Sequence, residues 1–294
     1  MKDIPSKNIE MLRERMCAEH LDAYILPVHD PHHSTPVLPQ WDAMAQYLGC
    51  HAEGMQLIVT PTQLAVCASG QIDDGCLTAV NSANATIITD AGMMYGWLAE
   101  QCSVSGASHE VALDAMTWTE PEVMIWQGEL RRRGGITLRT NLNLLPPLSD
   151  CAAPVLQSDP LLCRDRLASL RIALRERHAD GMLVARQSDV RWLLCLPEGA
   201  PEQHFPAYLL VSTTDVTLFP SRVEINDVDE QWLLSAGIHI RPYHSVAKAL
   251  SDYFEYNILL DPDEIPFGLY RYIGRQIIKE LSPVSRLKAV KNKD

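Results

Sequence analysis

The feature that most constrains the fold of this chain is an internal repeat. The segment NIEMLRERMCAEHLDAYILP (8–27) matches RLASLRIALRERHADGMLVA (166–185) at a constant offset of 158 residues. The aligned pairs include Leu12 with Leu170, Arg13 with Arg171, Met16 with Leu174, Asp22 with Asp180 and Ile25 with Leu183. Each copy has apolar residues at helical spacing and then a short apolar run, which predicts an amphipathic helix followed by a buried strand.

The remainder of each half continues in the same order. In the first half we predict a second helix at 41–48, strands at 55–60, 63–69 and 84–92, a helix at 120–135 and a strand at 135–145. In the second half we predict strands at 207–213 and 215–221, a helix at 229–237, a strand at 238–243, a helix at 245–254 and a strand at 257–262. The repeated order predicts an α/β protein built from two similar domains in tandem, each a mixed sheet flanked by helices.

A proline-rich segment separates the two halves. Residues 142–160 contain four prolines and show little periodicity, which is typical of a boundary between domains. We therefore predict a first domain at 1–150 and a second at 160–283.

Composition and charge exclude several kinds of partner. The net charge of −12 argues against a nucleic-acid surface or an anionic membrane, since either partner requires a basic patch. The N-terminus lacks the apolar run of a signal peptide, and the longest apolar stretches are too short to span a bilayer. The eight cysteines form no CxxC pair, so reduced thiols in a cytoplasmic protein are expected.

The stretch HDPHHS (29–34) is the most concentrated set of chemically active side chains. His29, Asp30, His32 and His33 could ligate a metal ion, which would make the chain a small metalloenzyme. A metal site needs ligands held on rigid elements, however, and no HExxH, CxxC or EF-hand pattern accompanies this loop. Phosphate-binding and nucleophile-elbow motifs are also missing from the sequence. The metal interpretation, with His29, His32 and His33 as ligands, stays open as the less favoured alternative.

The order of segments resembles the N-terminal region of the Xaa-Pro aminopeptidase (aminopeptidase P) family. LDAYILPVHDPHHS resembles a strand followed by that family's Asp-x-His-x-Ser loop, and QLIVTPTQLAVCASGQ resembles the strand pair that comes next. RQSDVRWLLCL resembles the family's D-x-x-x-WLLNLRG segment in its second domain. SPVSRLKAVKNKD is similar to the linker that leads into the family's catalytic domain. The resemblance covers essentially the whole chain, and the linker is its most specific part.

This resemblance implies two creatinase N-terminal-like domains with a ribonuclease H-like fold, and residues 284–294 would begin the linker. It implies that catalysis belongs to a third, pita-bread metallopeptidase domain that holds two divalent ions, usually manganese. None of that domain's metal ligands has a counterpart here, so by this resemblance the chain is not an enzyme by itself and holds no cofactor. Asp30, His32 and Ser34 fall at the family's loop positions, and we expect them to contribute to substrate access or a domain interface.

Several polar positions depart from the family pattern. The family's Ser-Glu-Tyr is Ser34-Thr35-Pro36 here, and its Asp-Gly-Arg-Tyr is Ser69-Gly70-Gln71-Ile72. Gln71 therefore stands where the family has an arginine that reaches the substrate region, and an amide cannot bind a carboxylate as arginine does. We count Gln71 with the residues expected at substrate access or a domain interface. In the second domain, the family's Asn-Leu-Arg-Gly becomes Cys195-Leu196-Pro197-Glu198.

Three functional hypotheses follow. The first is the non-catalytic N-terminal region of a cytoplasmic Xaa-Pro aminopeptidase, which shapes substrate access and supports homo-oligomerisation. Its partners would be its own catalytic domain and, indirectly, proline-containing peptides. The second is a stand-alone binding or assembly module without a peptidase domain, which the departures at Pro36, Gln71 and Pro197 favour. The third is the small metalloprotein built on residues 29–33.

Overall fold

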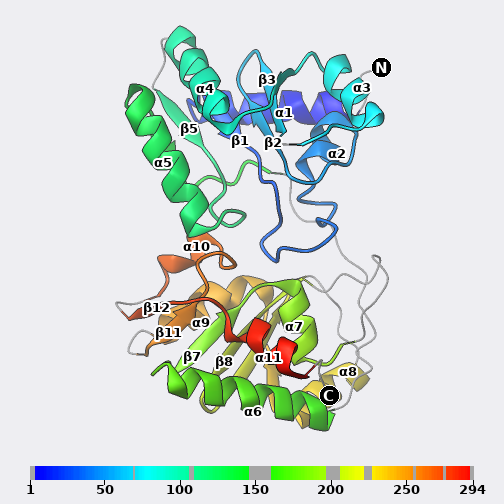
Figure 1. Cartoon of the computed structure of the whole chain (residues 1–294), viewed down its shortest axis with the longest axis vertical. Coiled ribbons are helices and arrows are strands. Elements are labelled where there is room, and N and C mark those ends of the chain that lie inside the picture. The colour runs from blue at the N-terminus through cyan, green and yellow to red at the C-terminus, as the bar shows by residue number, and fades with distance from the viewer. Residues whose placement is uncertain are drawn as a thin grey trace. The chain divides into compact units, whose positions relative to one another are not determined.

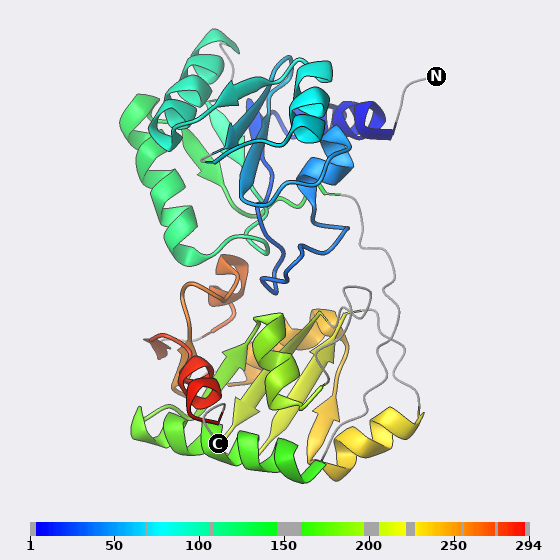
Figure 2. The same ribbon diagram turned by 45° about the vertical axis from the view of Figure 1, so that its right-hand side comes forward.

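The protein divides into two compact units. The computed structural model describes residues 4–68, 70–105, 109–145, 160–196, 206–221, 227–253, 256–273 and 276–291. One unit comprises Met1–Asp30 and Pro36–Leu148, and the other comprises Pro31–Thr35 and Ser149–Asp294. The proline-rich segment predicted as the domain boundary falls mostly outside the described residues, which resume at residue 160. Figures 1 and 2 show the elements of both units.

The first unit is a six-stranded mixed sheet with helices on both faces. Its helices are α1 (Ile4–Ala18), α2 (Ala43–Leu48), α3 (Asp74–Ser82), α4 (Ala91–Ser105) and α5 (Glu120–Gly134). Its strands are β1 (Ala23–Ile25), β2 (Met55–Val59), β3 (Leu64–Ala68), β4 (Thr86–Ile88), β5 (Glu110–Ala112) and β6 (Thr137–Arg139). The strand order is β4-β3-β2-β1-β5-β6, with β2 antiparallel to both of its neighbours and the other pairs parallel.

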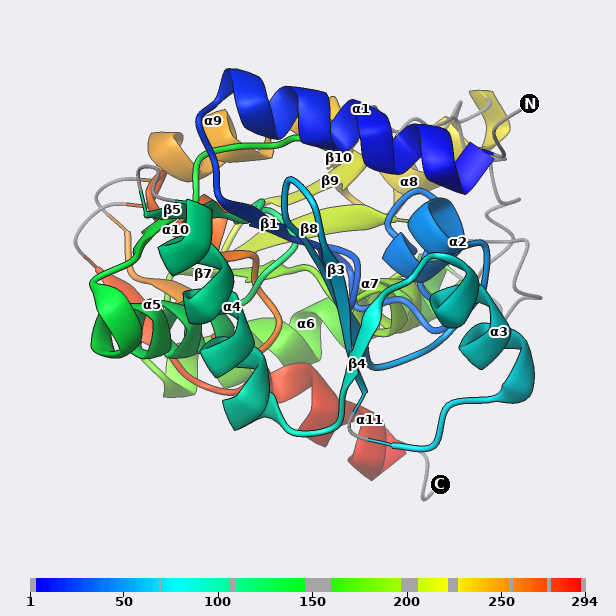
Figure 3. The same ribbon diagram turned by 90° about the horizontal axis from the view of Figure 1, so that it is seen from above.

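Alternating side chains of the central strands divide the first core between two faces. Tyr24, Leu57 and Val66 pack in one cluster with Leu12 and Met16 of α1 and with residues of α2 and α3. Since successive side chains of a strand point to opposite faces, their neighbours along β1 to β3 pack on the other face. Figure 3 shows α1 on one side of this sheet and α4 and α5 on the other.

The second unit repeats the same architecture. Its helical elements are α6 (Pro160–Glu176), α7 (Gln187–Leu193), α8 (Asp227–Ser235), the 3₁₀ turn η1 (Tyr243–Ser245), α9 (Val246–Asp252), α10 (Phe267–Tyr270) and α11 (Pro283–Lys291). Its strands are β7 (Gly181–Val184), β8 (Ala207–Ser212), β9 (Val216–Pro220), β10 (Ile238–Ile240), β11 (Ile258–Leu260) and β12 (Ile277–Lys279). The strand order β10-β9-β8-β7-β11-β12 reproduces that of the first unit. The predicted α/β class, with two similar mixed sheets flanked by helices, is confirmed.

The repeat extends to individual hydrogen bonds. Arg13 donates to the carbonyl oxygens of the β2–β3 turn, at Thr60 (3.0 Å) and Gln63 (3.2 Å). Arg171, its counterpart at the same offset, donates to Ser212 O (2.9 Å) and Thr214 O (3.1 Å) in the β8–β9 turn. An arginine on the long helix therefore fixes the neighbouring hairpin in both units.

The C-terminal ends of the two long helices, α1 and α6, also correspond. His20 and His178 have φ angles of 56° and 54°, and each follows its helix in the left-handed conformation that ends helices. The next aspartates then tie the first strand of each sheet to its parallel neighbour: Asp22 Oδ2 accepts from Glu110 N (3.1 Å) and Asp180 Oδ2 from Asn257 N (2.8 Å). These shared details support an origin by duplication.

Some elements differ from the sequence-based expectations. The sequence predicted neither the strand β5 nor the helix α4. Residues 284–291 of the segment predicted as the start of a linker belong to α11, which contacts α6 and α7. Among the described residues, no helix is both long enough and apolar enough to cross a membrane. The cysteines in the described part of the chain are free thiols.

Candidate functional site

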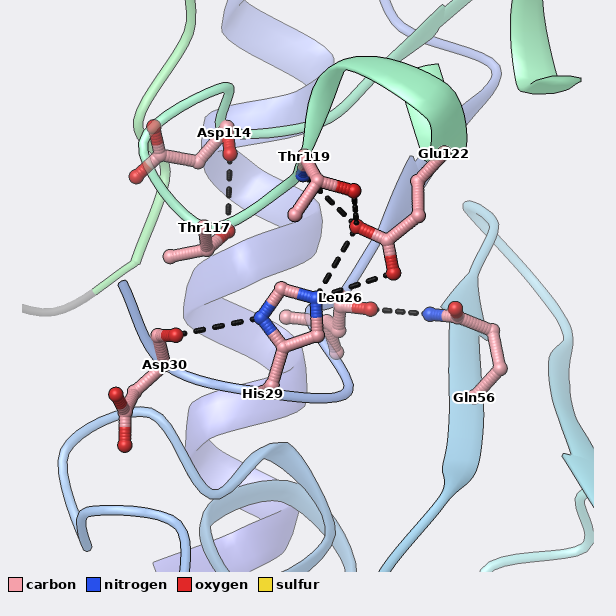
Figure 4. Close-up of polar contacts among 8 residues, drawn as sticks. All are labelled: Leu26, His29, Asp30, Gln56, Asp114, Thr117, Thr119 and Glu122. Carbon is pink, nitrogen blue, oxygen red and sulfur yellow. Dashed lines mark hydrogen bonds and ion pairs between the residues drawn. The ribbon is translucent and has the colours of Figure 1, made fainter. Parts of the chain in front are cut away.

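The polar residues of the first unit concentrate where β1 and β5 end. The loop after β1 carries His29 and Asp30, and the loop after β5 leads through Asp114 and Thr119 into α5. Because β1 and β5 are parallel neighbours, their carboxyl ends meet at one edge of the sheet, which is where open α/β sheets commonly bind ligands. Figure 4 shows His29, Thr119 and Glu122 in contact there, while the carboxylates of Asp30 and Asp114 point away from His29.

His29 is the centre of this cluster. Its Nε2 lies 3.1 Å from each carboxylate oxygen of Glu122 on α5, and its Nδ1 lies 3.3 Å from the carbonyl oxygen of Asp30 (Figure 4). All of these partners are acceptors, so both ring nitrogens must carry hydrogen to make the bonds. The geometry therefore suits the positively charged form of His29.

Glu122 occupies its position because it caps α5. The Thr119 backbone N–H donates to Glu122 Oε2 at 2.8 Å as part of a capping box, and the Thr119 hydroxyl donates to the same oxygen at 2.8 Å. Pro121 at the start of the helix and the arginines of its last turn suit the helix termini and dipole. The sequence predicted this helix at 120–135, although it did not predict the contact with His29.

The charges of His29 and Glu122 stabilise each other. Burial alone would raise the pKa of Glu122, but the hydrogen bonds and charge of His29, together with those from Thr119, lower it to about 2. Burial would likewise lower the pKa of His29, yet the hydrogen bond and charge of Glu122, helped by Asp30, raise it above its usual value. The pair is therefore ionised at mildly acidic pH, below the usual histidine pKa of 6.5.

Further hydrogen bonds hold the two loops. Asp30 Oδ2 accepts from Leu38 N (3.1 Å), which closes the loop after β1. Asp114 Oδ1 accepts from Met116 N (2.9 Å), and the Thr117 hydroxyl donates to Asp114 O (2.9 Å). The arrangement fixes backbone conformation at the end of the sheet.

The residues predicted from the sequence do not form one site. His32 groups with the second unit, where its Nδ1 donates to Ala185 O (3.0 Å) and its Nε2 lies 2.8 Å from the Tyr243 hydroxyl. Gln187 N donates in turn to His32 O at 2.7 Å. His29 and His32 thus bond to different groups, and His33 is partly buried at a φ of 45°.

Of the four residues proposed for substrate access or a domain interface, three are enclosed. Asp30, His32 and Ser34 are buried, whereas Gln71 is exposed on the segment before α3. Pro197, the departure noted in the second domain, lies outside the described residues. Within the described ranges, no three His, Cys, Asp or Glu side chains are placed to hold a metal ion.

The second unit carries a different polar cluster at the equivalent place. Asp261 follows β11 as Asp114 follows β5, and its Oδ1 accepts from Asp263 N (3.0 Å) as Asp114 Oδ1 accepts from Met116 N. Beside it lie Glu264 and Asp189, both buried. Glu264 lies three residues further along the loop after β11, and the fold brings it next to Arg186 and Asp189 at the start of α7.

The chemistry available to the first cluster is that of a fixed ion pair. His29 uses both ring nitrogens in hydrogen bonds, and the Thr119 hydroxyl donates to Glu122 and not to His29. A histidine that activates a hydroxyl nucleophile must instead accept that hydroxyl's proton. The cluster therefore positions the loops after β1 and β5.

Comparisons with known proteins find a family match for the second half of the chain and similarity over nearly all of it to larger proteins. Residues 161–294 match the family described as the creatinase/prolidase N-terminal domain. A probable Xaa-Pro aminopeptidase P of Neurospora crassa is 22% identical over 311 residues, covering 96% of this chain and 45% of the relative. Xaa-Pro aminopeptidase 1 of Dictyostelium discoideum is 31% identical over 134 residues, covering 44% of this chain and 21% of the relative.

The fold has a solved counterpart. The crystal structure of an X-prolyl aminopeptidase from Caenorhabditis elegans, described as a cytosolic enzyme with a di-nuclear active site, matches with a TM-score of 0.77 at 18% identity. The match covers 97% of this chain and 51% of that one. The chain thus spans about half the length of the curated relatives that it matches. Residues 161–294 thus match the creatinase/prolidase N-terminal domain, and nearly the whole chain is similar in sequence to part of the Xaa-Pro aminopeptidase P relatives.

Proposed function

We propose that this chain is the non-catalytic N-terminal region of an Xaa-Pro aminopeptidase-like protein, in which it shapes substrate access and supports oligomerisation. The observation that carries the proposal is the similarity to aminopeptidase P relatives over 96% of the chain, which accounts for only 45% of the relative's length. In such a protein the remaining half would release the N-terminal residue that precedes a proline.

The polar cluster of the first unit supports a positioning role. His29, Glu122 and Asp30 bond to one another and to the backbone, so they hold the loops at the end of the sheet in one conformation. Gln71 is exposed and could contact a substrate or another domain by hydrogen bonding, without the charge of the family's arginine.

The proposal extends to cofactors, partners and location. The divalent ions would belong to the catalytic half, in keeping with the di-nuclear active site described for the Caenorhabditis elegans enzyme. The direct partner would be that catalytic domain in the same protein, proline-containing peptides would be bound there, and the assembly would be a homo-oligomer. The description of that enzyme as cytosolic supports a cytoplasmic location.

A chimera tests the proposal. The matched N-terminal part of the Neurospora crassa relative is replaced by residues 1–294, and hydrolysis of Xaa-Pro peptides of increasing length is measured with manganese present. We expect activity on short peptides with a length preference that differs from that of the unmodified relative. Residues 1–294 alone should show no hydrolysis. Hydrolysis by the chain alone, or an inactive but folded chimera, would refute the proposal.

A stand-alone binding module is the second candidate, because the family's substrate-reaching arginine is replaced by the exposed Gln71. A Gln71→Arg variant of the chimera separates the two functions. If the chain serves an active site, restoring arginine should change KM for the chimera. A binding module would give the same kinetics with and without the Gln71→Arg substitution.

A further inference from the structure

Three carboxyl groups lie buried together in the second unit. Asp189 comes from α7, and Asp261 and Glu264 come from the loop after β11; their exposed fractions are 1%, 3% and 4%. Two cations reach them: Arg186 Nε lies 2.9 Å from Glu264 Oε1, and Lys288 of α11 pairs with Asp189 Oδ1. Buried carboxylates need compensating charge or hydrogen bonds, and here three carboxyls share two cations.

The three carboxyls are compensated unequally. Asp261 accepts backbone N–H groups from Ser282 (2.6 Å) and Asp263 (3.0 Å), so its charge is well solvated by the protein. Asp189 has the ion pair on one oxygen, while its Oδ2 finds no hydrogen-bond partner among the described residues. Glu264 has Arg186, whose side chain is 40% exposed. We therefore take Glu264 as the carboxyl of the three that binds a proton.

Helix α11 closes over this cluster. Residues of the segment 281–286, which includes the first turn of α11, line a cavity of about 480 Å³ together with Asp261 and Glu264. One turn further on, Lys288 reaches Asp189 and lies 3.4 Å from the Ser188 hydroxyl. Val284 is fully buried in the core of the unit. Figure 1 shows α11 beside α7, which agrees with the contacts between them.

We propose that these residues form a proton-dependent clasp, which holds α11 firmly on the second unit while Glu264 is protonated and less firmly once Glu264 is ionised. The clasp consists of Asp189, Glu264, Arg186 and Lys288. It uses residues of this chain alone, so it does not depend on the proposed function. Its effect is to make the attachment of the last described helix respond to pH near neutrality.

The direction follows from linkage between proton binding and docking. Burial, and next the neighbouring Asp189 charge, raise the pKa of Glu264 to about 7. Pro283, Ser285 and Arg286 of α11 line the same cavity as Glu264, so we expect the burial of Glu264 to fall when α11 leaves, and its pKa to move toward the usual 4.5 despite the loss of the nearby Lys288 charge. Docking therefore takes up a proton, so the contribution of Glu264 to docking is complete at low pH and is lost as the pH rises through about 7.

The charged groups around Glu264 act on its pKa in both directions. Arg186 and Lys288 oppose the raised pKa, and Asp189 and Asp261 add to it. The other charged side chains that line the cavity are Arg177, Asp263, Glu280 and Arg286. Arg177 and Glu280 pair with each other at 3.3 Å and so contribute little net charge.

Hydrogen exchange measured by mass spectrometry tests the clasp. Amide protection of residues 283–291 is compared at pH 6 and pH 8, after correction for intrinsic exchange, with α6 as the internal reference. In the unaltered chain we expect α11 protection to fall about fivefold or more between the two pH values, while α6 stays constant. Equal protection of α11 at both pH values would overturn the proposal even if no variant could be made.

Two variants and a matched control sharpen the test. Glu264→Gln should remove the pH dependence and keep α11 protected at pH 8. Arg186→Gln removes the opposing cation, so the pH at which protection is lost should move upward, a shift that a purely structural role would not produce. Glu280→Gln alters an acid of the same cavity and should behave as the unaltered chain. A Glu264→Gln chain that retains the pH dependence, or an unmoved midpoint in Arg186→Gln, contradicts the clasp.

Discussion

A histidine whose two ring nitrogens both face oxygen acceptors serves as a fixed positive charge and not as a proton shuttle. His29 is such a residue, because Glu122 and the Asp30 carbonyl are its partners. The sequence indicated that HDPHHS is the chemically dense loop, and it left metal binding there as the less favoured alternative. It could not predict the role of Glu122, which lies far along the chain and meets His29 only because β1 and β5 are parallel neighbours. The roles of Glu264 and Lys288 were not predictable from the sequence either, because their partners lie far away along the chain and neither residue belongs to a local motif.

The His29–Glu122 pair predicts a defined pH dependence of stability. The Glu122 pKa is lowered to about 2, so its contribution is present above about 4.5 and is lost as the pH falls through about 2. The pKa of His29 is raised, so its contribution is complete below about 6.5 and is lost as the pH rises through the raised value. His29→Gln should therefore lower the free energy of unfolding by about 1 kcal/mol at pH 5.5, since Glu122 is partly solvated, and by less at pH 9.

Urea unfolding at the two pH values measures this effect. His51→Gln is the matched control, because His51 pairs with Asp42 at 2.7 Å but is 83% exposed. The control should change stability little at either pH. A loss in His29→Gln that is the same at pH 5.5 and pH 9 would show that the charge of His29 contributes nothing.

Gly181 offers a second test at the residue scale. A Cβ at this position would lie 3.0 Å from Val211 O and 3.3 Å from Ile258 Cδ1, between the two strands that flank β7. Gly181→Ala should lower the free energy of unfolding by about 1–3 kcal/mol, because neither a strand backbone nor a packed core moves easily. Gly128→Ala, in the interior of α5 with open space around it, should raise stability by about 0.5–1 kcal/mol. Thermal unfolding compares the two; a neutral Gly181→Ala would contradict the packing.

At the scale of elements, hydrophobic periodicity predicted the long helices and the strand pairs of the hairpins. The helices at α1, α5 and α6 and the hairpins β2–β3 and β8–β9 were predicted from apolar spacing and turn residues. The strand β5 was missed because it has three residues and is buried in the middle of a parallel pairing, so it shows no alternation. Helix α4 was missed because apolar residues occur all round it, which gives no helical stripe.

The arginine that fixes each hairpin should contribute equally in both units. Arg13→Met and Arg171→Met each remove two hydrogen bonds to turn carbonyls while keeping the apolar stem. We expect each to lower the free energy of unfolding of its own unit by about 1–2 kcal/mol, as measured by denaturant titration. Arg175→Met, on the exposed side of α6, is the control and should have little effect. A large loss in one unit only would show that the two arginines are not equivalent.

At the scale of the whole molecule, the offset of 158 residues was the decisive observation. It predicted two similar α/β units, and the identical strand orders confirm them. The sequence could not predict which polar groups each copy would bury, because a duplicated backbone tolerates different side chains at the same place. His29 and Glu122 occupy in one unit the region that Arg186, Asp189 and Glu264 occupy in the other.

Each unit has its own hydrophobic core, which predicts independent folding. One core cluster lies entirely within 9–145 and the other within 163–287. We expect fragments 1–148 and 160–294 to give separate cooperative thermal transitions, followed by circular dichroism. A fragment that binds a hydrophobic dye and melts without a transition would show instead that the two units depend on each other.

The position of β1 in its sheet has a kinetic consequence. Tyr24 pairs with Val59 of the nearby β2, whereas Ala23 pairs with Val111 of the distant β5. Closing the longer loop is slower and entropically less favourable, so the hairpin side of the sheet should assemble first and the parallel side last. During synthesis, a nascent first unit would hold β1 with one open edge until β5 leaves the ribosome, and the second unit would pass through the same stage while it waits for β11. At this stage each unit would have one central strand with an open edge. The two similar strands, β1 and β7, are then most able to pair wrongly with each other.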